Sequence, residues 1–535
     1  MGGRASSYPN SIPAVALRSA ERFGDRIAIV DGEIYLSFDE LKEQMLTVSS
    51  SLISTGVQAG DRIALWAPNS AVWITSALGI LACGAWLVPI NTRFTAREVE
   101  PILRAVDASL LLVADGFIGG ERLQGIKEAN PTLRAIADPV LLPDPGEQSR
   151  PEWDGFLRRG SSVPRVVTSD RLAKLGPQDV SDVIFTSGTT GTPKGVMLRH
   201  GASLRAYSAF NDSFGVSEGD RVLIGLPFFH CFGYKAGWLV DLLAGATTYP
   251  LAVFDGKKVM EMVELHAITH LPGSPTMFWP LLDDPERRKH DLSSVRAAIV
   301  GGASIPVTLV RRLQDDLGID RVLSGYGLTE NHAVISFSLP GDSPELVATT
   351  VGKVLDGMEV ITVDNYDQPL SRGAEGELWV RGYAQMSGYF GDPASTAAAF
   401  SDGWLRTGDV GTVDENGYIR ITDRKKDIYV TGGFNVAPAE VENVLMTCEQ
   451  ISQAAVVGVP DDRMGEVGAA FVVPVPGLEL PPEFVMRYIR ERLANYKVPR
   501  YVNTVDSLPI NPTGKVLKDE LRALFSTIPH AGHTL

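Results

Sequence analysis

The chain has 535 residues, too many for one ordinary domain, and this length predicts two to four structural units. Hydrophobic residues make up 44% and charged residues 21%, a composition that excludes a disordered chain and suits a loop-rich globular enzyme. The net charge of −15 argues against nonspecific binding to nucleic acid.

The first third of the chain alternates helical and extended patterns. A helix and a strand are expected within 11–30, and apolar residues at three- and four-residue spacing predict a helix over 37–55. The alternation continues with strands over 61–66, 86–89 and 109–113 and helices over 72–82 and 96–105. This pattern indicates a largely parallel sheet covered on both faces. Residues 116–175 are richer in Pro, Gly and Arg and are interpreted as an irregular connection.

Targeting and membrane signals are weak. Residues 71–90 carry no charge and are long enough to span a bilayer, but Gly79, Gly84 and Pro89 interrupt them. We interpret this stretch as a buried helix that runs into a strand. Residues 1–14 lack the apolar core of a signal peptide. The three cysteines are far apart, without metal-ligand spacing, which favours a reducing compartment. We therefore expect a cytoplasmic protein with no transmembrane segment and no disulfide framework.

A loop rich in Gly, Ser and Thr, TSGTTGTPKG, covers residues 186–195 between two apolar segments. This arrangement predicts strand, loop, strand. Its glycines allow close backbone approach, and its N–H groups, hydroxyls and Lys194 can converge on phosphate oxygens. It is not a Walker A loop, because Lys194 follows Pro193 and precedes Gly195. The loop favours phosphate binding, with a surface turn as the alternative.

The middle of the chain continues the α/β pattern. Beyond residue 350 the pattern changes to short strand-like segments. Two strands, ending near 300 and 324, run into Gly301-Gly302-Ala303 and Gly325-Tyr326-Gly327, and the carboxyl ends of strands are where α/β sheets bind ligands. Strand-like pieces between 359 and 421 then indicate a small β-rich subdomain. We place a domain boundary within 423–427, followed by a compact α/β domain.

Eight short motifs follow the loop in order: Pro227–His230, Gly301–Ala303, Gly325–Glu330, Gly376–Gly382, Thr407–Asp409, Asp423-Arg424, Gly432–Asn435 and Asn511–Lys515. Together they closely resemble the adenylate-forming superfamily of acyl-CoA synthetases, firefly-luciferase-like enzymes and adenylation domains, over about residues 15–525. The resemblance implies an α/β fold with a large N-terminal domain, 1–422, made of two doubly wound α/β subdomains and a small β-rich subdomain. A hinge, 423–427, and a small mobile α/β C-terminal domain, 428–535, would follow.

The resemblance implies an AMP-forming acid–thiol ligase that uses ATP, Mg²⁺ and coenzyme A. A carboxylate attacks the α-phosphate of ATP to give acyl-adenylate and pyrophosphate, and the thiol of coenzyme A then displaces AMP. Both transition states place negative charge on oxygens, so fixed donors and cations should dominate catalysis. Two alternatives remain open: an acyl-AMP ligase that loads a carrier protein, and a degenerate homologue that only binds ligands.

The resemblance also assigns roles to single residues. The expected ATP-binding residues are Thr186, Ser187, Gly188, Thr189, Thr190, Gly191, Lys194, Gly302, Ala303, Tyr326, Gly327, Asp409 and Arg424. Among them Tyr326 would stack on adenine, and Asp409 with Arg424 would bind the ribose. The expected catalytic residues are Lys515, Thr329, Glu330 and His230, with Glu330 as the Mg²⁺ ligand. Lys515 would bridge the carboxylate and the α-phosphate. Taken alone, Lys515 would be interpreted as a solvated lysine and His230 as packing.

The resemblance places the second half-reaction at the hinge and beyond it. Lys426 would be the pivot about which the C-terminal domain rotates. Gly432 and Gly433 would then face the pantetheine channel of coenzyme A, where side chains would obstruct the thiol. One departure from the family is Lys518, where an arginine is usual, which keeps the charge and loses the bidentate fork.

The acid is expected to bind in a wide aromatic pocket lined by Phe229, His230, Tyr234, Trp238, Ser274, Gly302, Gly325 and Asn331. The absence of an aspartate near 229–231 argues against an amino acid. The run HCFGYKAG over 230–237 is similar to actinobacterial acyl-CoA ligases of steroid degradation, which implies a hydrindane-dione propionate as substrate. A medium- or long-chain fatty acid is the alternative. Lys235 would meet a ring ketone or snorkel to solvent. The expected partners are small molecules only, and a homodimer is left open.

Overall fold

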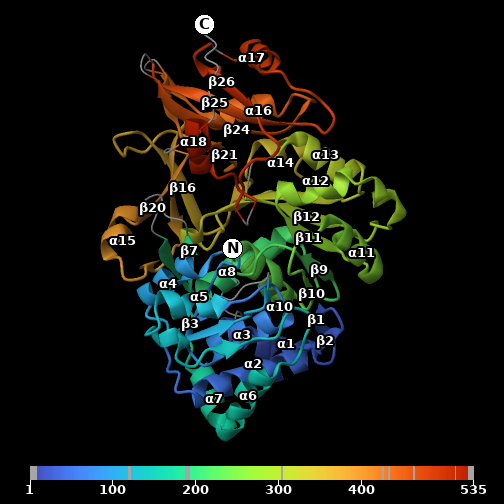
Figure 1. Ribbon diagram of the computed structural model, residues 1–535, viewed down its shortest axis with the longest axis vertical. Coiled ribbons are helices and arrows are strands. Elements are labelled where there is room, and N and C mark those ends of the chain that lie inside the picture. Colours follow the sequence, from blue (N-terminus) through green and yellow to red (C-terminus); the bar gives the residue numbers. More distant parts are fainter. Residues whose placement is uncertain are drawn as a thin grey trace.

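A computed structural model of the chain describes residues 9–117, 122–186, 193–302, 305–424, 427–431, 434–461, 464–493, 495–511 and 514–527. Of residues 424, 434 and 435 it describes the backbone only. Figure 1 shows a large part built from the first four-fifths of the chain, with a smaller part, coloured orange to red, at the top. The fold is mixed α/β with a large N-terminal domain and a small C-terminal domain, as predicted.

The first sheet of the large domain has seven strands in the order β18-β8-β7-β4-β3-β5-β6. They are β3 (Arg62–Trp66), β4 (Trp86–Pro89), β5 (Leu110–Val113), β6 (Val140–Leu141), β7 (Val180–Thr186), β8 (Lys194–Arg199) and β18 (Gly388–Tyr389). Strands β7, β4, β3, β5 and β6 are parallel, whereas β8 and β18 are added antiparallel at the edge. The strand–loop–strand predicted around the Gly/Ser/Thr loop is thus the β7–β8 hairpin.

The second sheet has nine strands in the order β15-β14-β13-β12-β11-β9-β10-β1-β2. They are β1 (Ile27–Asp31), β2 (Ile34–Ser37), β9 (Arg221–Ile224), β10 (Thr247–Pro250), β11 (His270–Gly273), β12 (Ala297–Val300), β13 (Arg321–Tyr326), β14 (Ser336–Phe337) and β15 (Lys353–Val354). The six central strands, β13-β12-β11-β9-β10-β1, are parallel to one another. The amino-terminal strands β1 and β2 therefore belong to this sheet and not to the one formed by the strands that follow them.

Helices between the two sheets form the largest apolar core. Helices α1 (Ile12–Phe23), α2 (Phe38–Ser54), α3 (Ala71–Ala82) and α8 (His200–Phe214) contribute to it, together with Ile63 of β3 and Val222 of β9. A capping box starts α2: the Glu40 N–H donates to Ser37 Oγ, and Glu40 Oε2 accepts from the Ser37 N–H at 2.8 Å. Gly79 lets α3 approach α2, because a Cβ there would lie 2.4 Å from Val48.

The uncharged stretch that begins at residue 71 is the buried helix α3 followed by β4, as expected. Every residue of α3 is buried, and the Trp73 N–H donates to Ser70 Oγ at its start. Within the described part of the chain, no helix combines the length and the apolar character needed to cross a bilayer. The lack of charge in α3 reflects its contacts with protein on all sides.

The expectation of an irregular connection over 116–175 is wrong. This segment contains the helices α5 (Arg122–Ala129), α6 (Pro151–Arg159) and α7 (Arg165–Ala173) and the short strand β6. These helices are short, and only two or three residues of each are buried. The Ser50 and Thr168 hydroxyls, 2.8 Å apart, link α7 to α2. Because one narrow apolar stripe suffices to attach each helix, its charged remainder has the composition of a loop.

The third sheet is the predicted β-rich subdomain. Its strands β16 (Met358–Val363), β17 (Gly376–Gly382), β20 (Trp404–Val413), β19 (Phe400–Ser401) and β21 (Ile419–Arg424) pair antiparallel. Strand β21 ends inside the expected hinge, 423–427. The positions of the domain boundaries stay a prediction.

The C-terminal domain has its own sheet, β23-β22-β25-β24 with β26 beside β25. Its elements are β22 (Tyr429–Thr431), β23 (Phe434–Val436), α16 (Pro438–Leu445), β24 (Ile451–Asp461), β25 (Gly465–Pro474), α17 (Pro482–Arg490), β26 (Tyr501–Thr504) and α18 (Lys518–Thr527). Two apolar clusters lie within it, one centred on Tyr429 and Val456 and the other on Phe471 and Leu521.

Candidate active site

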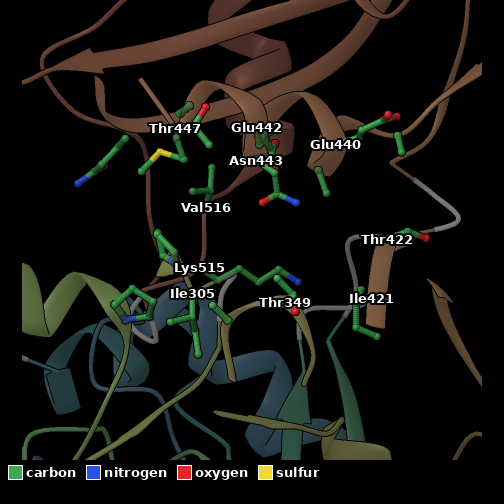
Figure 2. A pocket seen from close by; sticks show the side chains of 18 of the residues that line it. Ile305, Thr349, Ile421, Thr422, Glu440, Glu442, Asn443, Thr447, Lys515 and Val516 are labelled. Carbon is green, nitrogen blue, oxygen red and sulfur yellow. The ribbon is translucent and has the colours of Figure 1, made fainter. Parts of the chain in front are cut away.

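A cleft of about 2820 Å³ separates the C-terminal domain from the large domain. Its floor includes Gly302 and Gly325, at or just beyond the carboxyl ends of β12 and β13, and its roof includes residues of α16 such as Glu442. Lys515 also lines it. In Figure 2 the Lys515 side chain extends across the cleft near Ile305 and Thr349, on the side opposite Glu442.

Lys515 is bonded to Asn511, and its neighbour Gly514 lies against the large domain. The Lys515 N–H donates to Asn511 Oδ1 at 2.8 Å, and the Asn511 N–H donates to the Lys515 carbonyl at 2.7 Å. Gly514 has φ +83°, and a Cβ there would lie 2.7 Å from Ser274 Oγ, just before α12 (Pro275–Asp283). Since only a glycine fits this contact, the loop brings Lys515 to the ligand-binding edge of the second sheet.

Two residues expected to bind adenosine lie together although they come from different sheets. The Tyr326 hydroxyl, on β13, donates to Asp409 Oδ2, on β20, at 2.5 Å. Asp409 is buried and pairs in register with Arg424 of β21. The side chain of Arg424 lies outside the described residues, and so does Ala303.

On the phosphate side the structure describes only the ends of the loop. Thr186 and Lys194 face each other across the β7–β8 hairpin. The predicted phosphate ligands Ser187, Gly188, Thr189, Thr190 and Gly191 lie outside the described residues. The ammonium of Lys194 is 5.1 Å from the centroid of the Tyr389 ring, and the Tyr389 hydroxyl donates to Glu330 Oε1 at 2.9 Å. Tyr389 was missed by the sequence reasoning, because nothing in the local pattern distinguishes it from a core tyrosine.

The turn that carries Thr329 and Glu330 is constrained on all sides. Asn331 is followed by His332 and Ala333, which have φ of 54° and 59°. This backbone conformation is strained for residues other than glycine. His332 is buried, and its Nε2 accepts the Arg199 N–H at 3.2 Å. Its Nδ1 lies 2.5 Å from the Ala384 carbonyl, so this nitrogen carries the proton. Burial lowers the pKa of His332 to about 3, and the ring is neutral.

Glycine is also required beside this turn. A Cβ on Gly327 would lie 2.1 Å from the Ala333 carbonyl carbon. The Tyr207 hydroxyl donates to the His332 carbonyl at 2.7 Å. The sequence analysis did not identify His332 either. Nothing in the local sequence indicates that a histidine two residues after the glutamate holds this turn in place.

Among the residues expected to bind the acid, His230 caps a short helix. Its Nδ1 accepts the Phe232 N–H at 3.2 Å, and desolvation lowers the pKa of His230 to about 4, so the ring is neutral near pH 7. Tyr234 and Trp238 follow on a π-helical segment, Tyr234–Leu239. Their rings stack with centroids 4.8 Å apart and pack on Trp73. The segment is kinked at Gly237, whose φ of −98° and ψ of −113° are not helical.

The expectations for Lys235 are corrected by its surroundings. The side chain is 0% exposed, so it does not snorkel to solvent. Its ammonium lies 2.9 Å from Asp182 Oδ1 and donates to Ser203 Oγ at 2.9 Å. The charge that the sequence suggested for a ring ketone is therefore already engaged by an ion pair that links the π-helical segment to β7.

The last group comprises the residues expected at the hinge and the coenzyme A channel, together with the departure from the family at Lys518. Lys426, Gly432 and Gly433 lie outside the described residues, so the hinge and the coenzyme A channel stay predictions. Lys518, in the place of the usual arginine, forms an ion pair with Glu442 at 3.0 Å. Over the described ranges, no three or more His, Cys, Asp or Glu side chains converge as a metal site.

Comparison with known proteins agrees with this geometry. The AMP-binding enzyme family model matches residues 17–390, and the model of the AMP-binding enzyme C-terminal domain matches 440–515. A 3-[(3aS,4S,7aS)-7a-methyl-1,5-dioxo-octahydro-1H-inden-4-yl]propanoyl:CoA ligase of Rhodococcus jostii is 47% identical over 97% of this chain and 99% of its own length. A ligase of the same name from Mycobacterium tuberculosis is 44% identical over 96% and 99%.

A solved structure is similar over the whole chain. The anthranilate CoA ligase in complex with anthranoyl-AMP superposes with a TM-score of 0.88 at 25% identity, covering 99% of this chain and 100% of that one. Because these relatives are named as CoA ligases, the carrier-loading alternative is not favoured. The order of the motifs, the two-domain fold and these full-length similarities together establish that the chain belongs to the AMP-binding enzyme family.

Proposed function

We propose that the acid activated by this AMP-forming acyl-CoA ligase is a ring-bearing propionate of the hydrindane-dione class. The observation that carries the proposal is the identity of 47% and 44%, over nearly the whole chain, to two ligases named for such an acid. A medium-chain fatty acid is the second candidate, because a mitochondrial medium-chain acyl-CoA ligase of Bos taurus is 32% identical over 94% of the chain.

Buried donors among and beside the residues expected to bind the acid support the ring acid. The Tyr234 hydroxyl and the Trp238 indole N–H are buried, and neither has a hydrogen-bond partner among the described residues. The Trp73 indole N–H is in the same situation. An unsatisfied buried donor costs about 1–3 kcal/mol. Ring ketones are acceptors that would satisfy such donors, whereas the hydrocarbon tail of a fatty acid has no acceptor to offer.

In this proposal the cleft performs both half-reactions. In the first, an oxygen of the carboxylate forms a bond to the α-phosphorus of ATP while the bond to the pyrophosphate oxygen breaks. Lys515 neutralises the charge between the carboxylate and the α-phosphate. Tyr326 and Asp409 hold the adenosine. In the second, the thiol of coenzyme A releases its proton to solvent and its sulfur forms a bond to the acyl carbon. The bond between that carbon and the phosphate oxygen breaks, and AMP leaves with its electron pair.

Lys194 and Glu330 would serve the triphosphate. Lys194, at the end of the loop, would bind phosphate oxygens. Glu330 would hold Mg²⁺, which usually binds proteins through one or two carboxylates plus substrate phosphates. A single carboxylate beside the phosphate-binding hairpin fits that pattern. When bound, Mg²⁺ supplies charge neutralisation at the phosphates.

The test is acid-dependent release of AMP and formation of the CoA thioester across a panel of acids. The panel contains the dioxo ring propionate, the same ring system without ketones, and linear acids of 8 to 16 carbons, whose apolar area rises with each CH₂. We expect the dioxo acid to have the highest kcat/KM. A tenfold preference for linear acids would refute the proposal.

Two conservative variants test the donors. Tyr234→Phe and Trp238→Phe each remove a donor and keep an aromatic ring. We expect each to lower kcat/KM for the dioxo acid by about tenfold, as one lost hydrogen bond predicts, and to leave the ketone-free ring acid within about twofold. Equal losses with both ring acids would assign these side chains to packing alone.

A further inference from the structure

Residues 384–390 form a short segment that is bonded to two separate parts of the active site. Its strand β18 pairs antiparallel with β8, and the Phe390 N–H donates to the Gly195 carbonyl at 2.7 Å. Nearer its start, the Met386 N–H donates to the Glu330 carbonyl at 2.8 Å. One segment therefore fixes both the strand that leaves the phosphate loop and the turn that carries the expected metal ligand.

The side chain of Tyr389 contacts both Glu330 and Lys194 directly. Its hydroxyl donates to Glu330 Oε1 at 2.9 Å, and its ring lies 5.1 Å from the ammonium of Lys194, within the range of a cation–π contact. The backbone of Tyr389 is also fixed, since its N–H donates to Thr396 Oγ1 at 2.9 Å.

Without Tyr389, the long and flexible side chains of Lys194 and Glu330 would have to become ordered when the nucleotide binds. Lys and Glu both lose several rotatable bonds on immobilisation, and that entropy opposes binding. The hydrogen bond from Tyr389 restricts one carboxylate oxygen of Glu330, Oε1. The ring restricts Lys194 through a contact that imposes no hydrogen-bond geometry on the ammonium. Tyr389 thus orients both groups at once without neutralising either charge.

We propose that Tyr389 is a positioning residue that holds Glu330 and Lys194 in place for the triphosphate and its Mg²⁺. The inference rests on the roles proposed above for Glu330 and Lys194. It predicts that the tyrosine strengthens the coupling between Mg²⁺ and ATP, and that it matters for adenylation and not for thioester formation.

The experiment measures ATP affinity by calorimetry on the full-length protein, once with Mg²⁺ and once with EDTA, without any acid. We expect Tyr389→Phe, which keeps the ring, to bind ATP in EDTA within about twofold of the unmodified protein. The gain in ATP affinity that Mg²⁺ brings should fall by about fivefold to tenfold, the size of one net hydrogen bond. Tyr389→Leu, which removes the ring as well, should also weaken ATP binding in EDTA by several-fold.

A matched control is Tyr418→Phe. The Tyr418 hydroxyl donates to Asp342 Oδ1 at 2.8 Å, so this variant loses the same kind of tyrosine–carboxylate bond outside the site. It should leave both affinities unchanged. As a second readout, Tyr389→Phe should slow acyl-AMP formation and leave thioester formation from supplied acyl-AMP unaffected.

Three outcomes would overturn the inference. An unchanged Mg²⁺ gain in Tyr389→Phe would show that the hydroxyl does not orient Glu330. Equal losses in both half-reactions together with a lower melting temperature would make Tyr389 a structural residue only. If the unmodified protein showed no Mg²⁺ gain, the role of Glu330 would fail and this inference with it. Failure of the ring acid in the substrate panel would leave the binding result intact, because no acid is present.

Discussion

Lys515 is the residue on which the first half-reaction should depend most. Its loop is bonded through Asn511, and Gly514 lies against Ser274 of the large domain. If Lys515 has the role proposed above, the Lys515→Ala variant leaves the developing charge on the carboxylate and α-phosphate oxygens without its cation. We expect acyl-AMP formation to fall by about 10²–10³-fold, the usual cost of removing one such group. Thioester formation from supplied acyl-AMP should persist, and pyrophosphate exchange followed by a thioester assay would separate the two. Survival of both half-reactions would contradict the assigned role.

His200 links stability to pH at the level of a single side chain. It is buried at the start of α8, its Nδ1 accepts the Ile12 N–H at 3.2 Å, and burial, assisted by Lys235, lowers the pKa of His200 to about 3. Between pH 6.5 and 3 the unfolded chain binds a proton at this position that the folded chain does not. Stability is therefore lost as the pH falls below 6.5. At pH 5 the loss from this histidine is roughly 2 kcal/mol.

The variant His200→Asn isolates this effect. Asparagine retains an acceptor for the Ile12 N–H and does not titrate. Urea unfolding at pH 7 and pH 5 should show a smaller loss of stability for the variant than for the unmodified protein. The other buried histidines contribute equally to both proteins and cancel in the comparison. Identical pH dependence of the two proteins would disprove the assignment.

At the scale of elements, a buried ion pair links the segment that carries two expected acyl-binding residues to the strand that precedes the Gly/Ser/Thr loop. Lys235 lies on the π-helical segment Tyr234–Leu239, Asp182 lies on β7, and Ser203 of α8 accepts a further hydrogen bond. Removing one partner of such a pair leaves a buried charge and typically costs about 3–5 kcal/mol, whereas replacing both is often close to neutral. The pair therefore fixes the position of the π-helical segment more than it adds net stability.

The corresponding experiment compares Lys235→Met and Asp182→Asn with the double variant. Each single change should lower the melting temperature by several degrees, and the double variant should recover most of the loss. If the π-helical segment then shifts, KM for the acid should rise in the double variant while KM for ATP stays near its original value. Additive losses of melting temperature would show that the two side chains do not act as a pair.

At the scale of the whole molecule, the structure places the C-terminal domain with Lys515 over the large domain. That contact leaves no room for a side chain on Gly514, whose Cβ would lie 2.7 Å from both Ser274 Oγ and Thr276 Oγ1. The positive φ of 83° adds backbone strain for any L-residue. We expect Gly514→Ala to slow acyl-AMP formation by at least tenfold, because a misplacement of about 1 Å can cost a factor of 10².

The same variant should keep thioester formation from supplied acyl-AMP if the C-terminal domain takes another orientation in that step. Parallel assays of the two half-reactions would decide this. Equal loss in both, with the variant still folded by circular dichroism, would argue that one orientation serves the whole reaction. Unchanged adenylation would show that the contact at Ser274 is not needed.

Much of the architecture could be predicted because it depends on local patterns. The capping box at Ser37 and the apolar spacing after it specify α2, and the β7–β8 hairpin follows from apolar segments on both sides of the Gly/Ser/Thr loop. The helices α5, α6 and α7 were missed, since a helix attached by two or three buried residues has a surface composition like that of a loop. The switch of β1 into the second sheet had no local signal either, because strand pairing depends on residues far apart in the chain.

By itself the sequence determined the family, through the order of its motifs. These motifs also predict roles for Lys194, Tyr326, Glu330, Asp409 and Lys515, because close approach to phosphate, metal and ribose restricts which residues can serve. Only the tertiary structure decided which of these side chains meet. Glu330 and Tyr389 are 59 positions apart, and Tyr326 and Asp409 are 83 apart, yet each pair is hydrogen-bonded. It also decided that Lys235 is buried against Asp182. The sequence does not distinguish a charged side chain that faces water from one that is buried in an ion pair. The partner depends on how elements that are distant in the chain pack together.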